Sequence, residues 1–347
     1  MKRLCVLLSL LNGANMLAQT LSVATYPSYV MAHHGYMSNI ESHGIGFELN
    51  YFKQKSALLE KYYPQLDVGH KINYINMGKP DLTGSAFAYI PNLNYRSKSN
   101  KLGQVVFQIG LGIAYVSQKF DPFENKENLA ISSHMNVAFQ TNIGWQSPLG
   151  LKVFGGLSHY SNGAFHAPNL GINILNLGIA QNILKRKVEI KPENDTFSQN
   201  KSWYIFGFMA SKEASIERQE RFYIYGMGLE KKWARKKPKR YWRTGLDINM
   251  DGQHGSYNNQ NQTSYLPTKI DESIESGLRL GHLWQMGRLE GFADLGFYIT
   301  SPSSLKKSYY QKIGLNYHLS GAIFIRTDLV SHVFAADYFS LGVGYAL

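Results

Sequence analysis

The chain has 347 residues, of which charged residues make up only 17% and aromatic residues 13%. This composition, with 23 Tyr and 32 Gly, favours short alternating strands over amphipathic helices. The formal net charge of +12 suits contact with anionic lipid headgroups or simply solvated loops, and nothing in it calls for a nucleic-acid partner.

The N-terminus has the order of a secretory signal peptide. Lys2 and Arg3 precede an apolar run over residues 4–11, and a small-residue site follows at Ala18. We therefore expect residues 1–18 to be a cleaved signal peptide and residues 19–347 to form a single domain. Cys5 is the only cysteine and lies in that signal, so a disulfide framework and a thiolate zinc site are both excluded for the mature chain.

Apolar and polar residues then alternate with a period of two along most of the chain. In the clearest run every second residue from Val105 to Tyr115 is apolar, and residues 135–145, 242–250, 289–299 and 337–347 repeat the pattern. Each run is roughly ten residues long, which is the length of a tilted strand that crosses a bilayer. Soluble sheets use strands of about half that length.

The connections between these runs differ in length from one side to the other. Short turns are expected at 147–150, 285–287 and 320–321, and long polar loops at 117–132 and 253–272. This asymmetry is typical of outer-membrane barrels, and a final amphipathic strand would close the ring. The sequence predicts an all-β, antiparallel transmembrane outer-membrane β-barrel of roughly 14 strands, within a range of about 12 to 16. The competing fold is a soluble sandwich or a set of lectin-like units.

One hairpin, over residues 155–173, places polar side chains on an apolar face. Ser161 and His159 share that face, and a turn near His166 would set His159 opposite Asn173 and Ser161 opposite Gly171. Polar groups in a lipid-facing band cost several kcal/mol unless they satisfy one another, so a cluster of three calls for a reason.

Nucleophilic catalysis supplies such a reason. A serine hydroxyl becomes a nucleophile when a histidine takes its proton and a third polar group orients the imidazole. Ser161, His159 and Asn173 could fill these roles, and Asn169 or the backbone amides around Gly163 could stabilise an oxyanion. A His-x-Ser pair in a strand is by itself a weak motif, and scattered polar residues at a barrel rim would explain it equally well.

The wider string resembles a known family. His-Tyr-Ser-Asn-Gly followed by Pro-Asn-Leu-Gly-Ile-Asn, within residues 157–173, resembles the active-site hairpin of the lipid A 3-O-deacylase family, which is acyloxyacyl hydrolase-related. A weaker likeness runs through residues 125–136 and through the last strand from Asp337. The resemblance implies a barrel that hydrolyses an ester-linked hydroxyacyl chain of lipid A, with Ser161 as nucleophile, His159 as general base and Asn169 at the oxyanion.

The third member of the trio departs from the family pattern. The best-studied type has a glutamate where this chain has Asn173, and an amide can accept a hydrogen bond but cannot stabilise an imidazolium by charge. The site could therefore be slower than a carboxylate triad, or inactive. A Ser-His-Asn trio is nonetheless workable, because outer-membrane phospholipase A, from an unrelated barrel family, uses one.

These observations lead to the prediction of a lipid A acyl-ester hydrolase in the outer membrane of a Gram-negative bacterium. Its partners would be lipid A, outer-membrane lipids and conceivably a second copy in a homodimer, without nucleic acid, cofactor or metal. His33 and His34 lack further ligands at metal spacing and are expected on the surface. The alternatives are an outer-membrane phospholipase and a non-catalytic pore or structural barrel.

Overall fold

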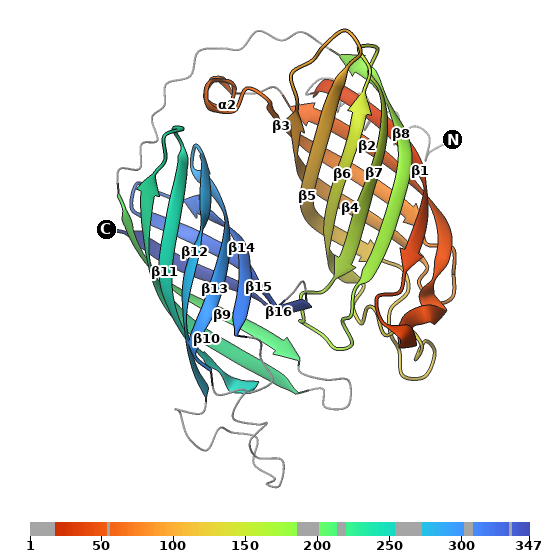
Figure 1. The fold of residues 1–347 in the computed structure, drawn as a ribbon. Coiled ribbons are helices and arrows are strands. Elements are labelled where there is room, and N and C mark those ends of the chain that lie inside the picture. The colour runs from red at the N-terminus through yellow and green to blue at the C-terminus, as the bar shows by residue number, and fades with distance from the viewer. Residues whose placement is uncertain are drawn as a thin grey trace. The chain divides into compact units, whose positions relative to one another are not determined.

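The computed structural model describes residues 18–53, 56–185, 201–213, 220–253, 273–301, 308–332 and 335–347. Its strands form two closed antiparallel barrels of eight strands each (Figure 1). The first barrel consists of β1 (Ala18–Met31), β2 (Ser42–Lys53), β3 (Leu66–Asn76), β4 (Ser85–Arg96), β5 (Gln104–Val116), β6 (Met135–Gln146), β7 (Leu151–Ser161) and β8 (Ile172–Lys185). The second consists of β9 (Trp203–Glu213), β10 (Arg221–Ala234), β11 (Arg240–Asp251), β12 (Ile274–Met286), β13 (Leu289–Thr300), β14 (Tyr309–His318), β15 (Ile323–His332) and β16 (Ala335–Ala346).

Two short helices accompany the first barrel. The 3-10 helix η1 (Gly35–Ile40) follows β1, and α2 (Ala57–Tyr62) follows β2 with Ser56 as its N-cap. Within the described ranges, no helix is long and apolar enough to cross a membrane.

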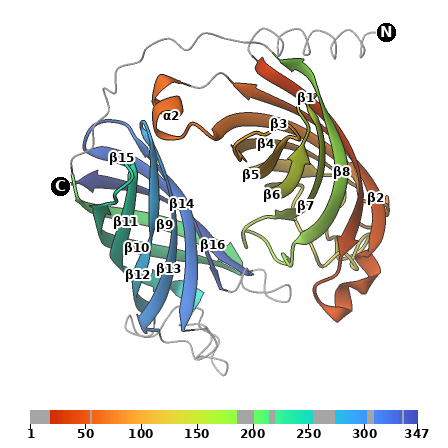
Figure 2. The ribbon, with the colours of Figure 1, turned by 45° about the horizontal axis from the view of Figure 1, so that its top comes forward.

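The prediction of an all-β, antiparallel barrel fold is confirmed. The expectation that roughly 14 strands close into one barrel is wrong, because the strands close into two. β8 pairs with β1, and β16 pairs with β9, so the sheet closes twice (Figure 2). Alternation along a strand shows which residues share a face, but it does not show which strand lies beside which. The sequence therefore could not show where a ring of strands closes. The expected signal peptide, apart from Ala18, and the expected loop over 254–272 lie outside the described residues.

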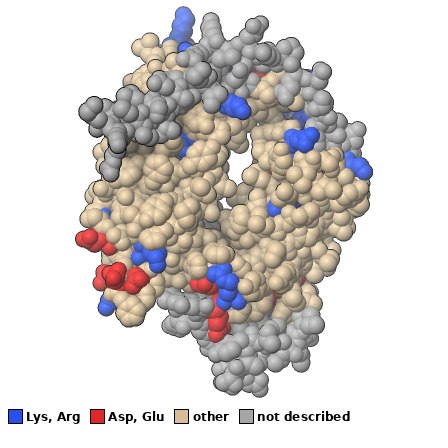
Figure 3. Space-filling view, turned by 180° about the vertical axis from the view of Figure 1, so that it is seen from behind, with Lys and Arg blue, Asp and Glu red and all other residues tan. Residues whose placement is uncertain are grey.

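The strand faces have the predicted polarity. On β5 the apolar residues from Val105 to Tyr115 point outward and are exposed, whereas Gln108 is buried inside the barrel. In the space-filling view of Figure 3, most of the described surface belongs to residues other than Lys, Arg, Asp and Glu. An apolar exterior around a polar interior is the arrangement of a transmembrane barrel.

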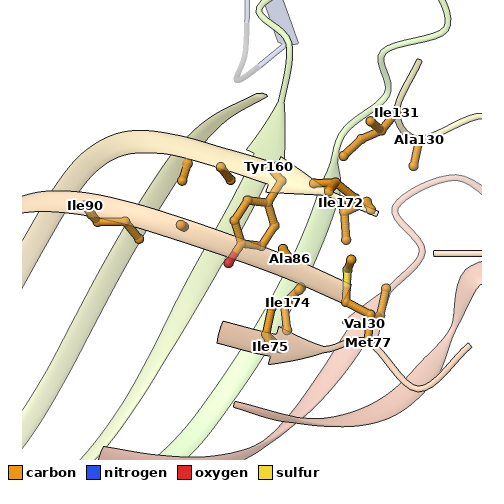
Figure 4. Packing of buried hydrophobic residues seen from close by; sticks show 14 of the residues in the cluster. Val30, Ile75, Met77, Ala86, Ile90, Ala130, Ile131, Tyr160, Ile172 and Ile174 are labelled. Carbon is orange, nitrogen blue, oxygen red and sulfur yellow. The ribbon is translucent and has the colours of Figure 1, made fainter. Parts of the chain in front are cut away.

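The interior of the first barrel is filled with side chains. Lys71 Nζ lies 2.9 Å from Glu48 Oε2 and donates to Gln108 Oε1, while Gln140 Nε2 donates to Glu48 Oε1. Removing one partner of such a buried pair typically costs about 3–5 kcal/mol, because the other charge is left uncompensated. Towards the end where β7 ends and β8 begins, the interior becomes apolar (Figure 4); this cluster includes Val30, Met37, Ile75, Met77, Ile131, Tyr160, Ile172 and Ile174.

The interior of the second barrel holds a charge network. Glu230 Oε2 accepts hydrogen bonds from Arg243, Arg279 and Arg326 at 2.7–3.0 Å. The guanidinium groups of Arg243 and Arg326 also lie 4.0 Å from the ring centroids of Phe292 and Phe206, respectively. Because these side chains are buried, the centre of this barrel is packed protein and not an open channel.

Candidate active site

The β7–β8 hairpin pairs His159 with Asn173, as the sequence predicted. His159 on β7 lies directly opposite Asn173 on β8. The expected pairing of Ser161 with Gly171 is wrong, because the ladder with β8 ends at residue 172 and Ser161 pairs with Val137 on β6. Gly171 has a φ of +81°, a left-handed conformation that cannot continue a strand.

The alternation of β7 fixes the direction of the candidate catalytic side chains. Tyr160 points inward, is fully buried and donates its hydroxyl to Asn73 Oδ1 at 3.2 Å. His159 and Ser161, one residue to either side, therefore lie on the outward face. His159 is half-buried, and Ser161 is only 8% exposed, so this serine is more covered than the lipid-facing position predicted from the sequence.

His159 is held by a short hydrogen bond. Its Nδ1 lies 2.7 Å from Asn173 Oδ1, which leaves Nε2 as the nitrogen that can act as a base. Among the described residues, no hydrogen bond joins Ser161 Oγ to His159. Catalytic hydrogen bonds are often long in the absence of substrate and tighten only in the complex.

Gly171 is the residue that gives the imidazole its room. A Cβ at this position would lie 2.4 Å from His159 Cε1 and 3.1 Å from Nε2. The backbone N–H of Gly171 also donates to the carbonyl of Ala130 at 2.8 Å, so the peptide cannot easily move away from the ring. Glycine is therefore favoured at position 171 for two reasons: the backbone is left-handed there, and the His159 ring occupies the space that a Cβ would need.

We expect Gly171→Ala to lower the rate of ester hydrolysis by about 100-fold, because a displacement of the base of about 1 Å has that effect. The matched control is Gly287→Ala: Gly287 also has a positive φ, +62°, but a Cβ there meets nothing within 4 Å. Initial rates of both folded variants would be compared. Equal rates would show that the position of the His159 ring does not limit hydrolysis.

Asn169 is placed by a backbone hydrogen bond. Its Oδ1 accepts the N–H of Asn162 at 2.8 Å, immediately after Ser161 in the chain. Because the oxygen is used in this way, the side-chain N–H₂ of Asn169 is the group left to donate, and the described residues offer it no hydrogen bond. An amide donor is the type of group that stabilises an oxyanion.

The connection between β5 and β6 braces this end of the hairpin. Asn162 Nδ2 donates to Ser132 Oγ at 3.1 Å, and the bond from Gly171 to Ala130 lies in the same connection. Within it, the buried Asn128 and the neighbouring Asn125 both donate to the carbonyl of Leu82. Asn125 and Asn128 therefore support the connections at this rim.

One residue of the site was missed by the sequence analysis. His33 is exposed, as expected, but it also accepts a hydrogen bond at Nδ1 from Asn173 Nδ2 at 3.1 Å. The pairing of Met31 on β1 with Asn173 on β8 brings it there, since His33 lies just past the end of β1. Within the described part of the chain, no group of three or more His, Cys, Asp or Glu side chains could hold a metal ion.

Comparison with known families matches the two barrels separately. A family model described as lipid A 3-O-deacylase (PagL) matches residues 34–182, which span most of the first barrel. A model described as acyloxyacyl hydrolase, C-terminal domain, matches residues 201–347, the second barrel. No curated protein sequence matches the chain.

Solved structures that match parts of this chain include a crystal structure of the outer membrane enzyme PagL. It is 19% identical with a TM-score of 0.37, and the match covers 47% of this chain and 99% of that one. The outer membrane protein Omp33 of Acinetobacter baumannii is 9% identical with a TM-score of 0.20, over 95% of this chain and 99% of that one. Because neither score reaches 0.5, the assignment depends on the two sequence models, which together cover most of the chain. By those models the first barrel belongs to the lipid A 3-O-deacylase family, and the second barrel is of the acyloxyacyl hydrolase C-terminal type.

Proposed function

We propose that the first barrel hydrolyses an ester-linked hydroxyacyl chain of lipid A, with Ser161 as nucleophile, His159 as general base and Asn173 as the group that orients His159. The observation that carries this proposal is the 2.7 Å hydrogen bond between His159 Nδ1 and Asn173 Oδ1, two residues from a serine on the same strand face. Family membership supplies the substrate class.

The chemistry follows from these groups. His159 Nε2 takes the proton of Ser161 as Oγ attacks the ester carbonyl, and the side-chain N–H₂ of Asn169 donates to the oxyanion that forms. The ester C–O bond then breaks, and His159 returns the proton to the departing sugar oxygen. Water, deprotonated by His159, attacks the acyl-serine, releases the hydroxy fatty acid and restores Ser161.

The position of the site in the barrel fits a membrane-embedded substrate. We place the barrel in the outer membrane, because its exposed outer face is apolar over strands of 11 to 14 residues. The site lies at one rim, where the connections β1–β2, β3–β4, β5–β6 and β7–β8 all gather. An outward-facing site at the rim can reach the ester of a lipid without removing the lipid from the bilayer.

The experiment that tests this proposal separates the two lipid substrate classes. Purified protein in detergent micelles would be given lipid A or a glycerophospholipid in parallel, and the released fatty acids would be quantified by mass spectrometry. We expect a hydroxy fatty acid from lipid A and far less release from the phospholipid. Ser147→Ala, in the turn between β6 and β7 at the opposite rim, serves as the control and should behave as the native protein. Preferred release from the phospholipid would instead identify a phospholipase.

A further inference from the structure

We propose that His33 is a positioning residue that fixes the orientation of the Asn173 amide and thereby selects the tautomer of His159 in which Nε2 is free to act as the base. This inference rests on the proposed function of Ser161 and His159. It concerns a residue outside the stretch that the deacylase model matches, which begins at residue 34.

The need for such a residue follows from the chemistry of an amide in place of a carboxylate. The two oxygens of a carboxylate are equivalent, so either one accepts the proton of His159 Nδ1. An amide presents an oxygen or an N–H₂ group, and only the oxygen holds the productive tautomer. In a serine protease, the same exchange of aspartate for asparagine lowers kcat by about 10⁴-fold because the histidine takes the wrong tautomer.

The structure resolves this ambiguity through His33. Asn173 uses its two polar atoms on two histidines: Oδ1 lies 2.7 Å from His159 Nδ1, and Nδ2 lies 3.1 Å from His33 Nδ1. A neutral His33 with a lone pair on Nδ1 can only accept, so it requires the N–H₂ group of Asn173 on its side. The oxygen of Asn173 is then directed to His159, whose Nδ1 must carry the proton.

His33 is itself kept in the accepting state. His33 is exposed to solvent, but the covered part of its ring, together with the neighbouring His34 and His159, lowers its pKa, so the ring is neutral at neutral pH. The ring centroids of His33 and His34 are 4.7 Å apart, so a charge on one disfavours a charge on the other.

Protonation of His33 would reverse the arrangement. A proton on Nδ1 makes His33 a donor, and the amide of Asn173 must turn so that Oδ1 faces His33 and Nδ2 faces His159. His159 would then accept at Nδ1 and carry its proton on Nε2, where it can no longer deprotonate Ser161. Two protonations, at His33 and at His159 itself, therefore switch the site off as the pH falls.

The closing experiment is a double-mutant cycle. His33→Ala is expected to lower kcat by about 10- to 100-fold with little change in KM, as does the loss of other groups that orient a reacting histidine. In an Asn173→Asp background, with two equivalent oxygens, His33→Ala should cost less than threefold. His34→Ala, which removes a neighbouring imidazole that makes no hydrogen bond to Asn173 within the described residues, is the control and should leave kcat at neutral pH unchanged. An equal loss in both backgrounds would mean that His33 only supports the local fold, and would overturn the proposal.

The pH profile and a substrate-independent probe complete the test. His33→Gln can accept from Asn173 through Oε1 but can also donate through Nε2, and it cannot titrate. Its kcat should therefore lie between those of the native protein and His33→Ala, and the acid limb of log(kcat/KM) should fall to a single protonation. The rate at which a fluorophosphonate labels Ser161 should follow the same order of variants. Labelling that depends on His33, without lipid A turnover, would sustain this inference while rejecting the proposed substrate. If the labelling rate were the same with and without His33, the role of His33 would be rejected and the proposed function of Ser161 would stand.

Discussion

Replacing Ser161 by alanine should abolish ester hydrolysis, with a loss of about 10³- to 10⁶-fold in kcat, as in other serine hydrolases that lose their nucleophile. No other described hydroxyl lies on the outward face of β7, since Ser158 points into the barrel, where it accepts hydrogen bonds from Gln140 and Asn176. The change removes one oxygen atom at the end of a strand, so the fold should persist.

A fluorophosphonate probe gives the most direct readout of this variant. The probe should label the native protein at the peptide that contains Ser161, and labelling should disappear in Ser161→Ala. Heat-modifiable migration in gels would confirm that the variant barrel is folded. Labelling of a different serine, with hydrolysis unaffected, would place the nucleophile elsewhere in the chain.

Asn173 carries the second large effect. Asn173→Leu keeps the approximate size of the side chain but removes the acceptor for His159 Nδ1 and the donor for His33, and we expect kcat to fall by about 10²- to 10⁴-fold. Asn173→Asp restores an acceptor and adds a charge that stabilises the imidazolium, so its kcat should equal or exceed that of the native enzyme. Steady-state kinetics on a soluble short-chain ester would measure both.

The control for this pair lies on the same strand. Asn182→Leu, near the opposite end of β8, changes the same side chain away from His159 and should retain native kinetics. If Asn173→Leu were as active as the native protein, Asn173 would have no part in orienting His159. A kcat of Asn173→Asp below that of the native protein would show that a negative charge beside His33 and His159 impairs hydrolysis.

The part of this site that the sequence predicted is the part that depends on local geometry. Strand alternation identifies which residues share a face, and a hairpin fixes its own register, so the pairing of His159 with Asn173 followed from the chain between them. Ser161 shows the limit of this approach. Its outward direction was predictable, whereas its low exposure of 8% depends on contacts outside the strand, which alternation does not report.

His33 could not be predicted because its position depends on closure. In a single barrel of roughly 14 strands, the first strand would pair with the last, and His33 would lie far from the hairpin. In the structure β1 pairs with β8, and Met31 lies opposite Asn173. A sequence of amphipathic strands specifies how many strands there are, but the choice of which two strands close a ring is made by long-range packing inside the barrel.

The central claim is that the outward-facing serine of the first barrel cleaves lipid A, and mass spectrometry of lipid A after incubation with the native protein or with Ser161→Ala tests it most directly. We predict that the native protein alone reduces the mass of lipid A by one hydroxyacyl chain. Lipid A left unchanged by folded native protein, or shortened equally by both proteins, would contradict the account.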